Sequence, residues 1–246
     1  IYACKQMNIA ILPPDVNESQ MEFTVENGKI RFAMAAIKSL GRPTIQAILK
    51  ERRENGSFIS MQDFVTRMSQ ALNRRAIENF VKAGAFDTFG HTRKSMMIVS
   101  ESMLDSAIKH NKDSMTGQMS LFDFAAEEDK KAFEIRIPDV AEYTKEELLG
   151  YEKEILGVYV SGHPLSEFKE ILTKNTSIDN GKLNSLKEDE ESYLSLDERD
   201  VIMGGMIANK TIKTTKRNDI MAFLDLEDLY GNIEVIVFPQ TLKKYN

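Results

Sequence analysis

The sequence has little of the chemistry on which secreted proteins and many enzymes depend: one cysteine, no tryptophan and three histidines among 246 residues. The single cysteine, Cys4, excludes an internal disulfide and fits a reducing compartment. No apolar run approaches the ~20 residues that a membrane span needs, and no signal peptide is visible. We therefore expect a soluble, cytoplasmic protein with no membrane partner. Because the chain begins with Ile1 and not with methionine, we expect a fragment.

The histidines and carboxylates give no sign of a catalytic or metal site. His163 has no cysteine or second histidine near it in the sequence, and the other histidines are His91 and His110, so a turn histidine is the better interpretation. Asp225 and Glu227 are the best candidates for a carboxylate pair that holds Mg²⁺, but solvated acids at a strand end are the commoner explanation. No glycine-rich phosphate loop of the Walker type is present. We predict no catalytic residue, no metal ligand and no cofactor in this chain.

The net charge of −6 hides a segregation along the chain. Residues 29–94 carry 13 Lys and Arg against five Asp and Glu, whereas residues 95–200 carry 12 against 24. A positive block beside an acidic block holds a polyanion in one place only. The alternative is a solvated helical surface that is rich in arginine, and composition alone leaves the two even.

The basic block contains a helix-hairpin-helix pattern. Residues 30–40 predict a first helix, and Thr44–Arg53 predicts a second one with Pro43 near its start, where proline is tolerated. Such a hairpin aims backbone N–H groups and a positive helix N-terminus at a phosphate without reading a base. The usual motif has glycine on both sides of the hydrophobic hairpin residue, and here a serine replaces the first glycine. The predicted phosphate contacts of this copy are Ser39, Gly41, Arg42 and Thr44.

A second, more degenerate copy follows the first. Short helices are predicted over Phe58–Met68 and Asn73–Ala83, Gly84-Ala85-Phe86 is the turn, and Thr92 begins a long helix that reaches about His110. Tandem copies that pack together form one compact helical unit. The alternative is a four- or five-helix bundle with no ligand, but the hairpins coincide with the positive block. The predicted nucleic-acid contacts of this copy are Arg74, Arg75, Lys82 and Gly84.

A five-residue segment in a polar stretch has the pattern of a docking peptide. Gln118-Met119-Ser120-Leu121-Phe122 follows Gly117 and precedes the acidic run Asp123–Asp129. Leu121 and Phe122 can fill a pocket on another protein, each worth roughly 1.5–3 kcal/mol of buried apolar surface, and Gln118 supplies a directional hydrogen bond. The alternative is a short amphipathic turn that folds back onto its own domain. The segment matches the pentapeptide by which bacterial replication proteins bind the ring-shaped sliding clamp.

The end of the chain predicts a β meander. The expected strands are Val201–Asn209, Ile220–Glu227 and Asn232–Phe238. Lys210–Asn218 is expected to be a basic loop after the first strand. Three meandering strands with a basic first loop resemble the start of an OB-fold, which binds single strands, and the remaining strands of the five are absent. The predicted single-strand contacts are Lys213, Lys216 and Arg217, whereas we expect Phe223 in the core beside Met221 and Leu224.

Between the docking segment and the strands lies an acidic connector, and its sequence carries the strongest resemblance. Thr144–Leu156 predicts a helix with a capping box at its start. Tyr151–Leu165 closely resembles the stretch between the clamp motif and the OB domain in the bacterial C-family replicative DNA polymerases, the DNA polymerase III alpha subunits. Leu12–Ser19 resembles the end of their fingers region, and Ala83–Asp87 resembles their helix-hairpin-helix region. The resemblance covers essentially the whole chain, in the right order.

This resemblance sets the expected organisation. The expected fold class is mainly α with a small β part: a tandem helix-hairpin-helix domain, an acidic α connector and an incomplete OB-like β meander. The expected domains are residues 1–28, the end of the fingers region; 29–110, the tandem helix-hairpin-helix DNA-binding domain; 111–131, a linker with the clamp-binding motif; 132–195, the connector; and 196–246, the N-terminal part of an OB-fold. In this family the catalytic aspartates and their Mg²⁺ belong to a palm domain that would precede Ile1.

The resemblance implies a noncatalytic part of a replicative polymerase. The hairpins would grip the product duplex, the pentapeptide would tether the chain to the clamp, and the OB segment would meet the single-stranded template. Other replicase subunits are further expected partners, and the expected place is the nucleoid. Tethering makes rebinding intramolecular and so raises processivity. The alternative is a stand-alone helix-hairpin-helix/OB DNA-binding adaptor that recruits a clamp, and an independently active nucleotidyltransferase comes third.

Overall fold

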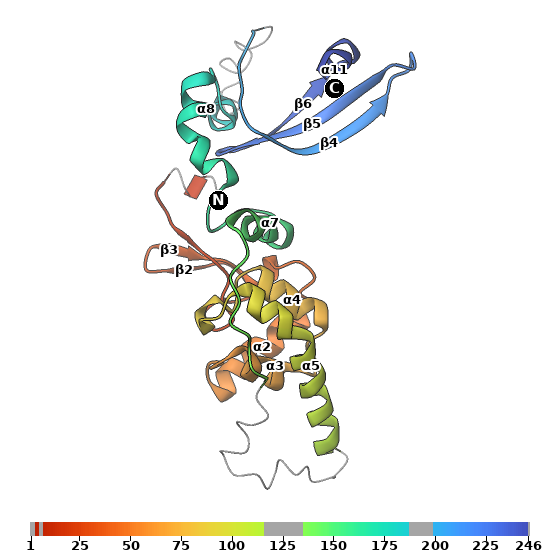
Figure 1. The fold of residues 1–246 in the computed structure, drawn as a ribbon. Coiled ribbons are helices and arrows are strands. Elements are labelled where there is room, and N and C mark those ends of the chain that lie inside the picture. Colours follow the sequence, from red (N-terminus) through yellow and green to blue (C-terminus); the bar gives the residue numbers. More distant parts are fainter. Residues whose placement is uncertain (1–2, 5–6, 116–134, 187–198, 246) are drawn as a thin grey trace. The chain divides into compact units, whose positions relative to one another are not determined.

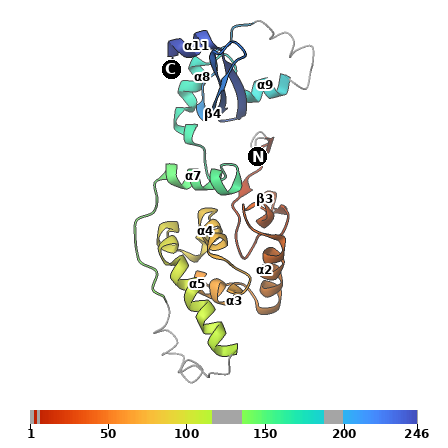
Figure 2. The same cartoon turned by 90° about the vertical axis from the view of Figure 1, so that its right-hand side faces the viewer.

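The fold is given by a computed structural model that describes residues 3–4, 7–115, 135–186 and 199–245. The chain forms two compact units, Ala3–Ser161 and Gly162–Asn246. We call the first the helical unit and the second the sheet unit. Figures 1 and 2 show α2, α3, α4 and α5 gathered in the helical unit, and β4, β5 and β6 side by side in the sheet unit.

The helical unit combines short strands with α-helices and 3-10 turns. Its elements are β1 (Ile11–Leu12), β2 (Thr24–Glu26), β3 (Lys29–Arg31), η1 (Met34–Ala36), α2 (Arg42–Asn55), α3 (Met61–Met68), α4 (Arg74–Lys82), η2 (Asp87–Phe89), α5 (Arg93–Met115) and α7 (Lys145–Leu156).

Polar side chains fix the starts of three of these helices. The side chain of Ser60 accepts a hydrogen bond from an amide in the first turn of α3, and Asn73 does the same for α4. At α7 the side chains of Thr144 and Glu147 form the capping box that the sequence predicts. The helices expected from residue 73 and from residue 144 are therefore confirmed, whereas α3 begins at Met61, three residues later than predicted.

Aromatic rings hold the centre of the helical unit. The ring of Phe64 on α3 meets those of Phe58, Phe80 and Phe86 edge-on, with centroids 4.9, 5.4 and 5.1 Å away. All four side chains are almost completely buried. Such edge-to-face pairs stabilise by about 0.5–1.5 kcal/mol each beyond their buried area. The rings therefore join α3, α4 and the turn after α4 in one packed core.

The helix predicted over residues 30–40 is wrong. Residues 29–31 form β3, which pairs antiparallel with β2 and parallel with β1, and η1 follows. The hairpin between β2 and β3 turns at Asn27 and Gly28, which have φ of +49° and +75°. An Asn-Gly pair with two positive φ angles is the turn that joins paired strands, and it overrides the helical spacing of the apolar residues that follow.

The connector segment 135–144, which precedes α7, is extended and packs against the helical unit. The backbone N–H of Ile135 donates to Gln62 Oε1 on α3 over 2.9 Å. The hydroxyl of Thr92 donates to the carbonyl of Val140 over 3.1 Å. Ile135 and Ile137 pack against the core. The segment is therefore fastened to both α3 and the start of α5.

The sheet unit is a small antiparallel sheet with helices around it. Its elements are η4 (Pro164–Phe168), α8 (Lys169–Asn175), α9 (Asn180–Leu186), β4 (Met206–Thr214), β5 (Ile220–Asp228), β6 (Gly231–Val237) and α11 (Pro239–Tyr245). The strand order is β4-β5-β6, and both pairs are antiparallel. The predicted fold class, mainly helical with a small β part, is confirmed.

The first strand of the meander lies later in the chain than predicted. It covers Met206–Thr214 and not Val201–Asn209, so most of the expected loop Lys210–Asn218 belongs to the strand. The turn lies farther on, where the N–H of Thr215 donates to the carbonyl of Asp219 over 2.8 Å. The part of the expected loop that lies in the strand, Lys210–Thr214, consists of three β-branched residues and two lysines, which suit a strand at the edge of a sheet. The second and third strands match the prediction within one residue at each end.

Candidate nucleic-acid interface

The first hairpin presents the open start of a long helix. Ser39 lies in the turn with φ of +61°, and α2 then begins at Arg42 with Gly41 as its N-cap. No side chain caps this end of the 14-residue helix. Within the described ranges, no group accepts a hydrogen bond from the backbone N–H of Arg42 or Thr44. Unpaired amides and the helix dipole give this end a positive potential that suits an anion.

The rest of the helical unit holds this hairpin in place. The side-chain amide of Asn79 on α4 donates to the carbonyl of Lys38 over 2.6 Å. The N–H of Lys38 donates to the carbonyl of Ile155 at the end of α7 over 3.0 Å. The hydroxyl of Thr44 donates to the carbonyl of Ala71 over 3.2 Å, so its proton is used inside the unit. The hairpin is therefore positioned by two helices that lie far along the chain.

Arginine side chains beside the hairpins differ in how far their charge is already paired. Arg42 is 75% exposed and lies 3.7 Å from Glu22, which is also exposed. Arg74 is bound more firmly, because it pairs with Glu78 over 3.0 Å and also with Glu101. The hydrogen bond to Glu78, followed by the charge of Glu101, raises the pKa of Arg74.

Two more predicted contacts of the second copy, Arg75 and Lys82, lie at opposite ends of α4. Arg75 is exposed near the start of the helix. Lys82, in the last turn, donates to both carboxylate oxygens of Glu154 on α7, over 3.1 and 3.2 Å, and its Nζ lies 5.3 Å from the ring centroid of Tyr151. The charge of Lys82 is therefore already balanced within the chain.

Gly84 is required by the packing of the second hairpin. Its φ is +78°, and a Cβ there would run into the guanidinium of Arg93 and lie 2.8 Å from a carboxylate oxygen of Asp87. Arg93 is buried and donates to Asp87 over 2.7 and 2.9 Å and to the carbonyl of Lys82 over 3.2 Å. The glycine thus leaves room for a buried arginine that ties the hairpin together.

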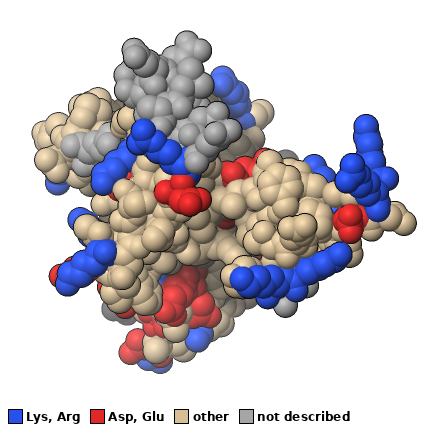
Figure 3. Space-filling model, turned by 90° about the horizontal axis from the view of Figure 1, so that it is seen from above, with Lys and Arg blue, Asp and Glu red and all other residues tan. Residues whose placement is uncertain are grey.

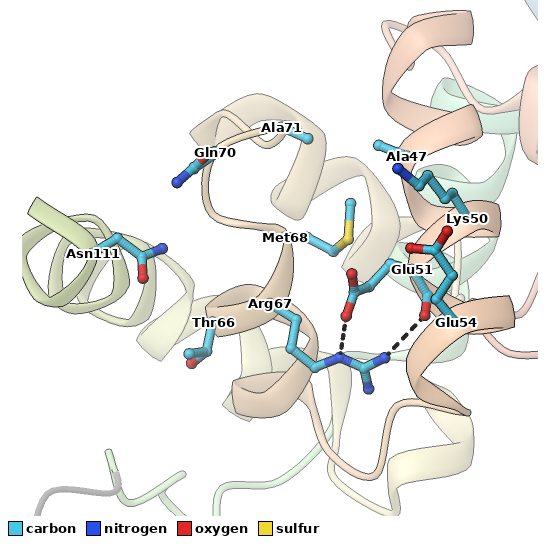
Figure 4. A pocket seen from close by; sticks show the side chains of 10 residues that line it. All are labelled: Ala47, Lys50, Glu51, Glu54, Thr66, Arg67, Met68, Gln70, Ala71 and Asn111. Carbon is cyan, nitrogen blue, oxygen red and sulfur yellow. Dashed lines mark hydrogen bonds and ion pairs between the residues drawn. The ribbon is translucent and has the colours of Figure 1, made fainter. Parts of the chain in front are cut away.

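A groove of about 550 Å³ lies between α2, α3 and the end of α5. Its lining residues are Ala47, Lys50, Glu51, Glu54, Thr66, Arg67, Met68, Gln70, Ala71 and Asn111, and Figure 4 shows Arg67 reaching across to Glu51. Arg67 also pairs with Asp63 over 3.1 Å and lies over the ring of Phe58. Because the guanidinium is occupied in this way and two acids line the wall, the groove does not favour a phosphate.

The sheet unit has one apolar face and one mixed face. Side chains of successive strand residues point to opposite faces, so Leu224 lies on the face of the fully buried Ala222, and Phe223 lies on the other. Phe223 is half-buried, and the prediction that it belongs to the core is wrong. The Nζ of Lys213, on the neighbouring strand, lies 4.6 Å from its ring centroid.

Further cations continue from this face to the end of the hairpin. Lys216 and Arg217 are exposed in the turn between β4 and β5. Figure 3 shows Lys and Arg side chains gathered at that end of the sheet unit. Ile236, directly opposite Phe223 on β6, is 46% exposed. An aromatic ring, a cation over it and exposed apolar surface on one face are the components of a base-stacking platform.

The pentapeptide Gln118–Phe122 lies outside the described residues. In the part of the chain that the structure describes, no three or more His, Cys, Asp or Glu side chains gather in a way that would hold a metal ion. Of the helices in the same ranges, none has the length and apolar content that crossing a membrane takes.

Sequence reasoning missed the contacts made by residues distant in the chain, among them Asn79, Glu101 and Glu154. No pattern in the sequence pairs these side chains with the hairpins, because the partners lie far apart in the chain. Arg74 and Glu101 are 27 residues apart, Lys82 and Glu154 are 72 apart, and Asn79 and Lys38 are 41 apart. The sequence signal that was present is the acidic character of residues 95–200, which balances the basic block.

Comparisons with known proteins agree with this arrangement. Residues 8–96 match the family described as "Helix-hairpin-helix motif". The chain is 33% identical over 246 residues to the DNA polymerase III subunit alpha of Mycobacterium tuberculosis (strain ATCC 25618 / H37Rv), a match that covers 98% of this chain and 20% of the relative. It is 34% identical over 254 residues to the subunit of the same name from Bacillus subtilis (strain 168), with 99% and 20% covered.

The same name belongs to the relative from Borreliella burgdorferi, which is 31% identical over 246 residues, with 100% of this chain and 21% of that protein covered. The chain therefore spans about one fifth of the length of the curated relatives that it matches. It is homologous to one segment of the DNA polymerase III alpha subunits, and its own residues 8–96 contain a helix-hairpin-helix motif.

Proposed function

We propose that this chain is the noncatalytic DNA- and clamp-binding part of a replicative DNA polymerase III alpha subunit, and that it supports processive DNA synthesis. The palm domain of such a polymerase would hold the catalytic carboxylates and their Mg²⁺, and other replicase subunits would be further partners. The complex would work on the nucleoid in the cytoplasm. Support comes from homology along the whole chain and from the helix-hairpin-helix motif.

The observation that carries the proposal is the open start of α2 beside an exposed arginine. A duplex phosphate would lie against the amides of Arg42 and Thr44, with the Arg42 side chain next to it. Ser39 and Gly41 are exposed at the same hairpin and leave room for the backbone of a nucleic acid. Because these groups reach phosphates and no base edges, duplex binding would be independent of sequence and would fall with salt.

The test of duplex binding compares two arginines of one helix. Arg42 lies at the start of α2 and Arg53 is exposed near its end. R42A should lower duplex affinity and make the log–log salt dependence shallower by about 0.9, the loss of one phosphate contact. R53A is the matched control and should leave the slope unchanged. Equal effects of the two variants would show that only overall charge matters, and no duplex binding by the unmodified chain would end the proposal.

For the clamp, the proposal relies on the residue pattern Gln118-x-x-Leu121-Phe122. A peptide of this size should bind with a Kd of about 1 µM, near −8 kcal/mol. L121A with F122A should abolish binding of a purified bacterial sliding clamp and leave duplex binding intact. M119A with S120A, which changes the two positions between the anchors, should retain clamp binding. Unchanged clamp affinity in the first variant would refute the assignment.

The sheet unit is proposed as the single-strand contact, with Lys213, Lys216 and Arg217 following the backbone. The support is the placement of Lys213 over the ring of Phe223 on the mixed face. The three-stranded sheet would be the first part of an OB-fold.

A stand-alone helix-hairpin-helix/OB adaptor that recruits a clamp is the second candidate, because none of these contacts needs a palm domain. A reading frame in which a palm-encoding region is joined directly to this segment would decide for the polymerase.

A further inference from the structure

Carboxylates of the connector contact the second hairpin at the positions that a DNA phosphate would take. Glu142 accepts hydrogen bonds from the backbone N–H groups of Arg93 and Lys94, the first two residues of α5, over 2.7 and 3.1 Å. Glu154 accepts two from Lys82 Nζ, over 3.1 and 3.2 Å. An acidic side chain of the same chain is thus bound at each of the two positive features of this hairpin.

The two hairpins differ in this respect. At the first hairpin the amides at the start of α2 have no acceptor among the described residues. At the second hairpin the start of the 23-residue α5 carries a carboxylate that uses both of its oxygens. A phosphate at a helix N-terminus likewise accepts hydrogen bonds from the free backbone N–H groups of the first turn. The carboxylate of Glu142 therefore occupies the place of a phosphate.

The connector helix α7 itself is held by buried contacts. Glu152 on α7 is 1% exposed, lies 3.7 Å from Arg93 Nη1 and accepts hydrogen bonds from the N–H groups of Val160 and Ser161, each over 2.9 Å. Ile155 belongs to the main hydrophobic core. Removing such a buried, paired carboxylate is strongly unfavourable. DNA that approaches the second hairpin therefore meets α7 in place.

Glu142 and Glu154, in contrast, lie at the surface. Glu142 is exposed, and the side chain of Glu154 is 54% exposed. The Lys82–Glu154 pair is an exposed ion pair, and such pairs contribute only about 0.2–1 kcal/mol. Glu142, which accepts from two backbone amides, is likewise exposed, so a polyanion can exchange with both carboxylates. The contact can be broken without unfolding the connector.

We propose that Glu142 and Glu154 screen the second hairpin from DNA, so that the connector and the duplex compete for the same amides and the same lysine. While both carboxylates are in place, the duplex does not contact Lys82 or the amides at the start of α5. This inference rests on the proposed duplex binding and changes its footprint, because Lys82 and the start of α5 become contacts only after Glu142 and Glu154 have moved away.

The test replaces the two screening carboxylates by amides and compares the result with a matched control. E142Q with E154Q removes two charges and keeps the size and an acceptor oxygen of each side chain. D139N with E146Q removes two exposed charges from the same extended segment and the same helix, and neither of these side chains accepts a hydrogen bond from the hairpin among the described residues. Duplex binding by the full chain is measured by fluorescence anisotropy at several salt concentrations, and thermal unfolding establishes that each variant is folded.

The screening variant should bind the duplex at least fivefold more tightly than the control variant at equal salt. Its log–log salt dependence should be steeper by one to two units, since each new phosphate contact adds about 0.9. Equal affinity and equal slope in the two variants would overturn the inference, because the change would then reflect only net charge.

A second measurement does not depend on duplex binding. Inorganic phosphate is titrated into each variant, and the backbone amide signals of Arg93 and Lys94 are followed by NMR. The inference predicts a saturable shift of these signals in the screening variant and none in the control variant. An absence of any such shift in both would overturn it. If no variant binds duplex and the phosphate shift is nevertheless present, the proposed function fails and the screening of the hairpin stands.

Discussion

The side-chain amide of Asn79 donates a 2.6 Å hydrogen bond to the backbone carbonyl of Lys38, and this bond fastens the first hairpin to a helix of the second copy. Asn79 is buried, and the bond spans 41 residues of sequence. The position of the hairpin proposed to bind a phosphate thus depends on α4.

We expect N79A to lower the free energy of unfolding by about 1 kcal/mol, the net value of one hydrogen bond. It should also weaken duplex binding, since the hairpin loses one of its anchors. N55A is the control, because Asn55 is exposed and its side chain bonds to Glu51 within its own helix. Urea unfolding and anisotropy measure the two effects. An N79A variant that matches N55A in both would contradict the anchoring role.

Ser39 has a φ of +61°, which costs a non-glycine residue energy. S39G should therefore raise the free energy of unfolding by about 0.5–1 kcal/mol. If the Ser39 hydroxyl does not contact a phosphate, S39G should also leave the salt dependence of duplex binding unchanged. S39V should destabilise, because a β-branched residue is a poor fit for a positive φ. Chemical denaturation of the three proteins orders them, and a less stable S39G would contradict the expectation.

Gly84 and Gly90 form a matched pair, with φ of +78° and +79°. An alanine at Gly90 meets nothing within 4 Å, whereas one at Gly84 runs into Arg93. G90A should cost about 1 kcal/mol of stability from backbone strain alone, and G84A should cost clearly more, since the buried guanidinium must move. Equal losses in thermal unfolding would show that the Arg93 contact adds nothing.

Arg75 is exposed, and Arg74 is paired with two carboxylates. If both contact phosphates, the double alanine variant should make the salt slope shallower by up to about two units. Because Arg74 must first leave Glu78 and Glu101, we expect R75A to account for most of the change. Salt titrations of duplex binding by the single variants separate the two, and a dominant R74A effect would reverse the assignment.

Phe223 is the aromatic residue that a single strand would stack on. F223L should weaken binding of an oligothymidine by about 1–3 kcal/mol and leave duplex binding unchanged. M221L, on the same face of the same strand, is the control.

Replacing Lys213, Lys216 and Arg217 together by alanine should weaken single-strand binding much more than duplex binding. Equal losses on both substrates would indicate nonspecific charge.

Local signals predicted the parts of the fold that depend on a few neighbouring residues. The side chains of Asn73 and of Thr144 with Glu147 mark the starts of α4 and α7 where helix capping requires them. The Asn27-Gly28 turn is an equally local signal, and it forms a β-hairpin although the spacing of the apolar residues after it predicts a helix where β3 lies.

The arrangement of the interface depends on contacts that no local pattern contains. The sequence gives the total positive charge of residues 29–94, but it does not show which of these cations are paired with acidic side chains. Lys82 and Arg74 are paired by acids from α7 and α5, and the start of α5 by Glu142. The start of α2, at Arg42, lies within two residues of the predicted start at Thr44, because Gly41 and Pro43 on either side of Arg42 mark the beginning of a helix.

The fastening of Ile135 to Gln62 has a mechanical consequence. Residue 115, the end of α5, and residue 135 both belong to the helical unit. A partner that binds the chain between residues 115 and 135 therefore exerts its force on the helical unit at both ends of this segment. The backbone does not pass that force through the sheet unit. A partner bound at Gln118–Phe122 would therefore exert its force on the helical unit, which carries the hairpins.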